Sequence, residues 1–145
     1  MTVFDKIEFY QASIIVIQTM DNKIFGAFCS QPWSDRITRS HLKPQFFGNG
    51  ESFLFEISPN LIKYDWVGKK NKGAVDTNQE LFLYADRDHL VVGGSTTQNN
   101  GPGLLINSNL INGRSCKSDT FENEILGGVE DFQIATFEVF TFISG

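Results

Sequence analysis

The stretch from Asp131 to Phe142, Asp-Phe-Gln-Ile-Ala-Thr-Phe-Glu-Val-Phe-Thr-Phe, is the part of the sequence that decides the fold. Its apolar side chains recur at every second position, which is the period of a β-strand. Phe132 and Ile134 share one parity, Phe137 and Val139 share the other, and Phe140 and Phe142 return to the first. Such a change of phase predicts a β-bulge, or a central strand that is apolar on both faces.

Shorter apolar runs along the rest of the chain predict further strands. The runs at residues 13–18 and 24–29 flank a turn at Asp21 and Asn22, which is typical of a β-hairpin. The later runs lie at residues 53–57, 62–67, 81–84, 90–92 and 104–106. Seven or more short strands joined by Gly- and Asn-rich turns predict a mainly β fold, a two-sheet antiparallel β-sandwich.

Three other segments lack the strand period. Helical spacing of apolar residues in residues 2–11 predicts one short amphipathic helix. Residues 31–45 are polar and irregular and predict an exposed loop, and residues 68–78, with three lysines, predict a flexible excursion. Neither a repeat nor a long linker divides the chain, so we expect residues 1–145 to form a single domain.

Composition narrows the class of protein. The 145 residues include 14 Phe but only five Tyr and Trp, and Phe rings need a core or an interface to cover them. The net charge of −5 argues against broad binding to nucleic acid or to anionic membranes. No apolar run approaches the roughly 20 residues of a membrane span, and no signal peptide is evident. With only two cysteines, we expect the reducing cytosol.

One glycine-rich turn carries a candidate catalytic carboxylate. Gly48 and Gly50 allow a sharp turn, and Glu51 follows them directly before a Phe-rich run. Glu51 is either a structural residue that accepts hydrogen bonds from backbone N–H groups or a general base in a cleft. We favour the structural interpretation because no partner acid is in view.

Cysteine and histidine offer little further chemistry. Cys29 lies in an apolar run and is expected to be a buried, inert thiol. Cys116 stands between Arg114 and Lys117, two cations that would favour its thiolate, so it is the better candidate for redox sensitivity. His41 is expected in a basic loop and His89 at a strand edge. Neither cysteine has a second ligand nearby, so we expect no metal site and no cofactor.

Taken together, these elements resemble a TLDc domain, the module of oxidation-resistance proteins. The matching segments follow one another in family order: Ile24-Phe25-Gly26-Ala27-Phe28, Pro32-Trp33, and residues 46–55, 64–68, 90–94, 112–115, 120–123, 130–132 and 137–140. Trp33-Ser34-Asp35-Arg36 makes the chain most similar to the subgroup linked to TBC domains. The chain would then be the C-terminal piece of a longer TBC–TLDc protein or a stand-alone TLDc protein.

The resemblance implies a fold, a function and a set of site positions. It implies a sandwich with few short flanking helices and a role in oxidative-stress protection and vesicle traffic, in the cytoplasm or at vesicles and lysosomes. The implied partners are subunits of the vacuolar proton pump (V-ATPase) and a TBC domain that acts on Rab GTPases, with membrane contact at most indirect. The implied binding positions are Gly48, Gly50, Glu51, Gly113, Arg114 and Asn123.

Two departures from the family pattern affect these expectations. The glycine run that usually follows Val92 stops after Gly94 and gives way to residues 95–100, Ser-Thr-Thr-Gln-Asn-Asn. The function of that loop is therefore in doubt. The closing Val-Trp-Gly of the family becomes Val-Phe-Thr here, so Phe140 is expected to keep an aromatic ring in the core.

Three hypotheses of function therefore remain. The first is a non-catalytic binding module that docks on a large partner through loops at one end of the sandwich. The alternative is a redox-reactive or hydrolytic protein that acts through Cys116 or Glu51. The third is an intramolecular module that positions a neighbouring TBC domain on vesicle membranes.

Overall fold

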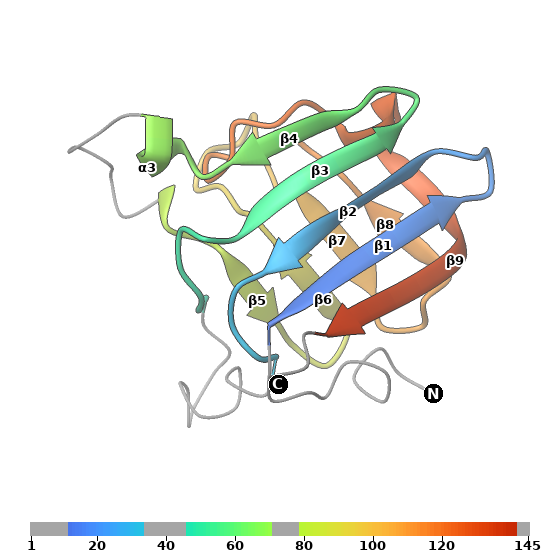
Figure 1. Ribbon diagram of the computed structural model, residues 1–145, viewed down its shortest axis with the longest axis horizontal. Helices are drawn as coiled ribbons and strands as arrows, with labels where there is room; N and C mark the ends of the chain where they lie inside the picture. Colours follow the sequence, from blue (N-terminus) through green and yellow to red (C-terminus); the bar gives the residue numbers. More distant parts are fainter. Residues whose placement is uncertain (1–11, 34–45, 71–78, 142–145) are drawn as a thin grey trace.

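The computed structural model describes residues 12–33, 46–70 and 79–141 (Figure 1). The helix predicted for residues 2–11, most of the loop predicted for residues 31–45 with His41, and Phe142 lie outside the described residues. Residues 71–78 of the predicted excursion lie outside them too.

Within the described residues, nine strands form one antiparallel sheet with the order β4-β3-β2-β1-β9-β8-β7-β6-β5. The strands are β1 (Ser13–Thr19), β2 (Ile24–Cys29), β3 (Phe53–Ser58), β4 (Ile62–Asp65), β5 (Leu83–Ala85), β6 (His89–Val92), β7 (Leu104–Asn107), β8 (Asn112–Arg114) and β9 (Asp131–Thr141). A short helix α3 (Val67–Lys70) and a 3₁₀ turn η2 (Leu126–Gly128) complete the secondary structure of this part of the chain. The mainly β fold with few short helices is confirmed.

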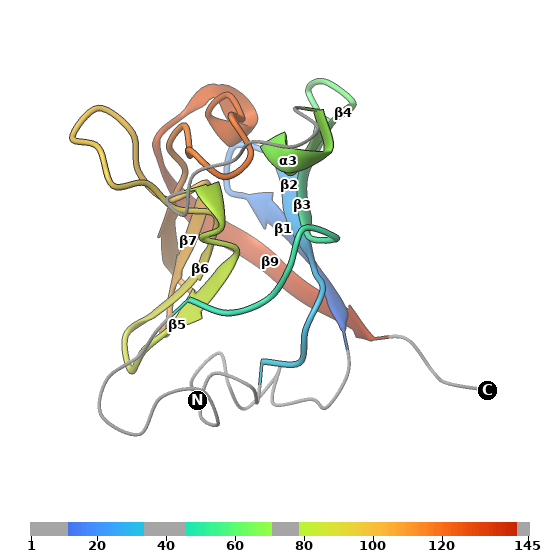
Figure 2. The same cartoon turned by 90° about the vertical axis from the view of Figure 1, so that its left-hand side faces the viewer.

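Strand β9 joins two layers that face each other. It pairs at its start with β8, where Gly113 lies opposite Phe132, and from Ile134 onwards with β1. Figure 2 shows β9 crossing from the layer of β5–β8 to the layer of β1–β4. The sandwich predicted from the sequence is therefore present, and its two layers are halves of one bent sheet.

The change of phase in β9 is a bulge. Gln18 of β1 lies opposite Thr136, but the next residue, Thr19, lies opposite Ile134. Ala135 is thus the extra residue, and it sits where β9 exchanges β8 for β1. Side chains that face the core switch from even to odd positions at this point, as the sequence pattern predicts.

The same bulge overturns one expectation, that Phe140 lies in the core. Without the bulge, Phe140 would share a face with Phe132, which is buried. With the bulge, Phe137 and Val139 take the inner face and Phe140 turns outward with 52% of its surface exposed. The aromatic residue at this family position therefore does not contribute to this core.

The core lies between the two layers and is lined by alternate residues of the facing strands. Ile15 and Ile17 of β1 are fully buried, as are Leu104 and Ile106 of β7. The ring of Phe132 meets that of Phe25 edge to face, with centroids 5.0 Å apart, and this contact joins β9 to β2.

Three local predictions were inaccurate. Strand β8 was not predicted because Asn-Gly-Arg has no apolar residue; it exists because β7 and β9 both pair with it. The strand expected at residues 81–84 begins only at Leu83. Val67 was expected in a strand and residues 68–70 in a flexible excursion, but they form α3.

Candidate functional site

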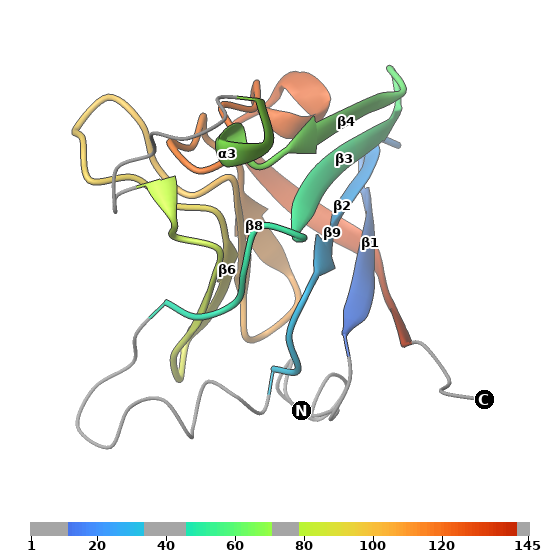
Figure 3. The ribbon, with the colours of Figure 1, turned by 60° about the vertical axis from the view of Figure 1, so that its left-hand side comes forward.

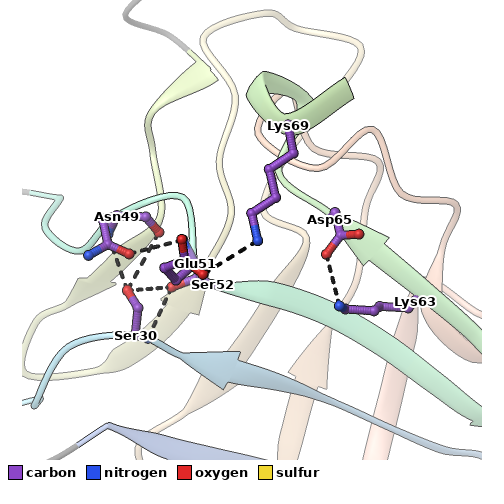
Figure 4. Close-up of polar contacts among 7 residues, drawn as sticks. All are labelled: Ser30, Asn49, Glu51, Ser52, Lys63, Asp65 and Lys69. Atoms are coloured by element: carbon purple, nitrogen blue, oxygen red, sulfur yellow. Dashed lines mark hydrogen bonds and ion pairs between the residues drawn. The ribbon is translucent and has the colours of Figure 1, made fainter. Parts of the chain in front are cut away.

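The turn before β3 is built around Gly48 and Asn49. Figure 4 shows Asn49 beside Ser30, Glu51 and Ser52. Gly48 has a φ of +98°, a region that disfavours residues with a Cβ. The side-chain oxygen of Asn49 accepts a hydrogen bond from the N–H of Glu51 at 2.9 Å, and its carbonyl accepts one from the N–H of Ser52 at 3.2 Å. The glycine and the asparagine therefore shape this turn together.

Two serines fasten the turn to the end of β2. The hydroxyl of Ser52 accepts a hydrogen bond from the N–H of Ser30 at 3.0 Å and donates one to the hydroxyl of Ser30 at 2.8 Å. The hydroxyl of Ser30 in turn accepts one from the N–H of Asn49 at 3.2 Å. Ser52 is buried, so its hydrogen bonds hold the turn against the end of β2 from the interior of the protein.

Glu51 points out of this turn. Its side chain is 74% exposed, and its carboxylate lies 3.5 Å from the Nζ of Lys69 on α3. The expectation that Glu51 accepts backbone hydrogen bonds in the turn is wrong, because Asn49 takes that role. An exposed ion pair of this kind contributes at most about 1 kcal/mol. Glu51 is thus a surface charge, available to a partner.

Trp66 explains the glycines around it. A Cβ on Gly50 or on Gly68 would collide with the indole ring, at 2.7 Å and 2.5 Å from its Cζ3 and closer still to a neighbouring ring carbon. The indole Nε1 donates a hydrogen bond to the carbonyl of Gln79 at 2.7 Å, and the ring meets Phe82 edge to face. A hollow of about 440 Å³ opens beside it, lined in part by Phe46, Gly48, Gly50, Trp66, Glu80 and Phe82.

Asn123 stabilises the loop at residues 118–123, which packs against α3. Its side chain is fully buried; its Oδ1 accepts hydrogen bonds from the N–H and the hydroxyl of Ser118, and its Nδ2 donates to the carbonyls of Cys116 and Glu124. The N–H of Val67 donates to the carbonyl of Thr120 at 3.0 Å, so this loop lies against α3, as Figure 3 shows. Asn123 is therefore a structural residue.

Asp119 secures the loop that replaces the family's glycine run. Its carboxylate accepts hydrogen bonds from the hydroxyl of Ser95 at 2.9 Å, the N–H of Thr96 at 3.3 Å and the side chain of Asn100 at 2.8 Å. Two of these three bonds come from side chains, of Ser95 and Asn100, that a glycine run would lack.

Four segments therefore meet at one end of the sandwich, and we call them the loop platform. They are the turn at residues 48–52, residues 66–69 with α3, and the loops at residues 93–103 and 118–123. Of the six predicted binding positions, Gly48, Gly50, Glu51 and Asn123 belong to it. The sequence analysis missed Trp66, Ser30 and Asp119; the signal for Trp66 was an aromatic residue between glycine-rich turns.

Gly113 and Arg114 lie in the other layer, on β8. A Cβ on Gly113 would collide with the ring of Phe132 and would lie 2.7 Å from the carbonyl oxygen of Leu105, so this glycine is needed for packing. Arg114 is half exposed and pairs with the carboxylates of Glu130 and Asp131. These two positions do not join the loop platform.

Cys116 has a mixed environment rather than a cationic one. Its Sγ lies 3.6 Å from the Oε1 of Glu130. Burial raises the pKa of the thiol and Glu130 adds to that increase, while Arg114 lowers the pKa by less. The guanidinium of Arg114 meanwhile holds the pKa of Glu130 below its usual range. Arg114 therefore favours the thiolate, as the sequence predicts, but burial, with a contribution from Glu130, outweighs it and leaves the pKa of the thiol raised.

Cys29 is inert, as predicted. It is fully buried in β2, and burial raises the pKa of its thiol to about 12 despite hydrogen bonds with Ser13 and Trp33. Its thiol therefore stays protonated at neutral pH and does not react as a thiolate.

His89 is the first residue of β6, which agrees with its predicted place at a strand edge. It lies beside the carboxylate of Asp86. Asp86 caps the β5–β6 turn, because its Oδ1 accepts hydrogen bonds from the N–H groups of Asp88 and His89 at 2.8 Å. Burial acts to raise the pKa of Asp86, but these bonds and the hydroxyl of Tyr84 outweigh it and lower the pKa.

We predict that Asp86→Asn lowers the free energy of unfolding by about 1 kcal/mol at pH 7. A carboxyl whose pKa is lowered by folding stabilises the fold above its ordinary pKa of about 4, and loses that contribution as the pH falls through the folded value. Urea unfolding of both proteins checks this: the difference should shrink near pH 3. A difference that stays constant with pH would contradict the role of the ionised carboxylate.

The described residues lack a metal-binding cluster and a membrane-spanning helix. No group of three or more His, Cys, Asp and Glu side chains there is arranged to hold a metal ion. In the same part of the chain, no helix has the length and apolar character needed to cross a membrane.

The fold and the loop platform define a class of protein: a β-sandwich in which glycine, asparagine and aspartate residues shape the loops at one end. The TLDc domain family model matches residues 1–143, and the chain belongs to that family. It is 31% identical to the GTPase-activating protein skywalker of Drosophila melanogaster over 98% of this chain and 24% of the relative. It is 29% identical to TBC1 domain family member 24 of Xenopus tropicalis over 93% of this chain and 30% of the relative.

A third relative represents the oxidation-resistance proteins. Oxidation resistance protein 1 of Bos taurus is 32% identical over 89% of this chain and 13% of its own length. The chain therefore spans less than a third of each of these relatives. Membership of the family predicted from the motifs is confirmed.

Proposed function

We propose that this chain is a non-catalytic TLDc binding module whose loop platform docks on the cytosolic sector of the vacuolar proton pump. The observation that carries the proposal is that the motif residues shape and fasten the loops of the loop platform. Gly50 makes room for Trp66, and Asn123 ties the 118–123 loop together. These contacts fix four loops in place and leave Glu51, Lys69 and the Ser95–Asn100 loop as outward groups. A rigid set of exposed polar loops suits recognition of a large partner.

The wider role that we propose is drawn from the names of two relatives. One is an oxidation resistance protein and another a GTPase-activating protein. We propose that this module serves oxidative-stress protection and vesicle traffic in the cytoplasm, at vesicle or lysosome surfaces. In a longer chain, it would place a TBC domain that acts on Rab GTPases.

Binding to purified proton pump tests the proposal. The chain is immobilised, and the detached cytosolic sector of the pump is passed over it. We expect saturable retention that excess free chain competes away. A matrix that carries heat-denatured chain is the control, and equal retention on both matrices would refute the proposal.

The alternative of a redox or hydrolytic protein receives less support from the geometry. Glu51 stands on an exposed turn, and the pKa of Cys116 is raised. Peroxide consumption by the purified chain, Cys116→Ser and Glu51→Gln should equal that of buffer. Consumption by the chain that either variant abolishes would favour the alternative.

Glu130→Gln provides a finer test of the environment of Cys116. Glu130 raises the pKa of the thiol through its hydrogen bond and its charge, so we predict that the variant lowers that pKa. The pH profile of alkylation by iodoacetamide measures it, and its midpoint should move to lower pH. Cys29 is buried and supplies the unreactive internal control. An unchanged midpoint would show that Glu130 does not act on Cys116.

A further inference from the structure

The layer of β1–β4 and β9 has an apolar outer face, although the outer face of an antiparallel sheet is ordinarily polar when it meets water. Outward residues alternate with core residues along these strands, and in two adjoining cross-strand rows six of them are apolar. They are Ile14, Val16, Phe28, Phe53, Phe55 and Phe140, and we call them the apolar outer face. Figure 1 views this layer from outside, and no described helix or loop crosses in front of it.

The strand register joins these side chains into one patch. The first row crosses β3, β2, β1 and β9 and consists of Phe53, Phe28, Ile14 and Phe140. The rings of Phe28 and Phe53 stack with centroids 5.4 Å apart, and those of Phe53 and Phe55 lie 6.3 Å apart. Phe140 ends the row with 52% of its surface exposed. A contiguous apolar patch of this kind indicates an interaction site.

The outer side of the other layer has a different character. There His89 lies opposite Asn107, and Asn112 lies opposite Gln133. These four polar side chains line one open hollow on β6–β9. That layer therefore follows the ordinary pattern of a sheet that meets water, and the apolar outer face is a property of one layer.

Charges of opposite sign stand at the two ends of the second row. From β4 to β9 this row consists of Lys63, Phe55, Gly26, Val16 and Glu138. Glu138 is exposed and has no cationic partner among the described residues. The Nζ of Lys63 lies 3.2 Å from the Oδ1 of Asp65, but the Lys63 side chain is 56% exposed. Such a pair is weak and leaves the ammonium group accessible to a second carboxylate.

The second row is complementary to itself about β2, the middle strand of the order β4-β3-β2-β1-β9. A two-fold axis along β2 places β3 over β1 of a second copy and β4 over its β9. Lys63 of each copy then faces Glu138 of the other, and Phe55 faces Val16. An axis across the strands would instead set Lys63 against Lys63 and Glu138 against Glu138. The charges therefore select the axis along β2.

We propose that the apolar outer face binds a second copy of this chain, in a two-fold dimer whose axis runs along β2. Sheets that pack face to face keep their strands aligned to within about 30°, and an axis along the strands preserves that alignment. Because β2 is the middle strand, this arrangement also gives the largest overlap of the two patches. Two Lys63–Glu138 pairs, one at each edge of the interface, fix its register.

Sedimentation equilibrium of the intact chain tests the proposal. We expect a reversible dimer with a dissociation constant of about 100 μM or tighter, because a patch on one five-stranded layer is at the small end of specific interfaces. Lys63→Glu and Glu138→Lys each set two pairs of like charges against each other, so each should weaken the dimer by about 10-fold or more. An equimolar mixture of the two variants should restore the dimer, because the mixed dimer regains both pairs of opposite charges.

Asp88→Lys is the matched control, because it makes the same change of charge as Glu138→Lys on the exposed β5–β6 turn. It should leave the dimer unchanged. The proposal is overturned if the unaltered chain stays monomeric, if the single variants dimerise as well as the unaltered chain, if their mixture does not recover the dimer, or if Asp88→Lys weakens it equally. Binding to phosphatidylcholine vesicles that Phe28→Ser abolishes would assign a membrane to this face and would also overturn it. None of these residues belongs to the loop platform, so failure here leaves the proposed pump binding untouched.

Discussion

Asn123→Ala is expected to lower the free energy of unfolding by about 2–4 kcal/mol. The side chain is fully buried and makes four hydrogen bonds, to Ser118, Cys116 and Glu124. Alanine leaves the N–H of Ser118 and two carbonyls without these partners in a place that water does not readily reach. The loss should also loosen the 118–123 loop and, through the bond from Val67 to Thr120, the whole loop platform.

Urea unfolding gives the stability change, and amide hydrogen exchange locates it. We expect faster exchange at Ser118 and at Val67 in the variant. Asn109→Ala is the matched control, because Asn109 is exposed and its side chain accepts one hydrogen bond, from the N–H of Ile111. Equal losses in the two variants would contradict a special role for Asn123.

Gly26→Ala is expected to cost about 3 kcal/mol or more, since overpacking against fixed backbone cannot relax. A Cβ on Gly26 would collide with the carbonyl oxygen of Ile15 on β1 and would lie 2.8 Å from the ring of Phe55. The carbonyl belongs to the ladder between β1 and β2, where Val16 lies opposite Gly26. Relief would require the two strands to part.

Gly128→Ala controls for glycine replacement in general. Gly128 has a φ of +81°, but nothing lies within 4 Å of an added Cβ, so only backbone strain of about 1–2 kcal/mol applies. Thermal unfolding should therefore show Gly26→Ala as clearly less stable than Gly128→Ala. The reverse order would show that β1 and β2 do not approach as closely as described.

The fold could be predicted where sequence-local patterns control it. The β1–β2 hairpin follows from two apolar runs around a turn, and the bulge at Ala135 follows from the change of parity in β9. Phe140 was expected in the core because it replaces the tryptophan of the family pattern, but the parity after the bulge turns it outward. Strand β8 was missed because its pairing depends on β7 and β9, and its own three residues carry no apolar signal.

The site could be predicted only as a set of motif positions. Glycine and asparagine in the 48–51 turn are recognisable because their backbone preferences are local. The contacts that join Trp66 to Gly50, and Asp119 to the 93–103 loop, link residues far apart in the chain. The same holds for Cys116, whose thiol is governed by Glu130 as well as by the neighbouring cations in the sequence.

The affinity of the proton pump's cytosolic sector for Glu51→Lys tests the central claim most directly. Glu51 is 74% exposed, so reversing its charge should leave the fold intact while it changes the face of the loop platform. Asp88→Lys makes the same change of charge on an exposed turn between β5 and β6. The account predicts that Glu51→Lys weakens binding by about 10-fold or more and that Asp88→Lys leaves it unchanged. Unaltered binding by Glu51→Lys, or equal weakening in both variants, would contradict it.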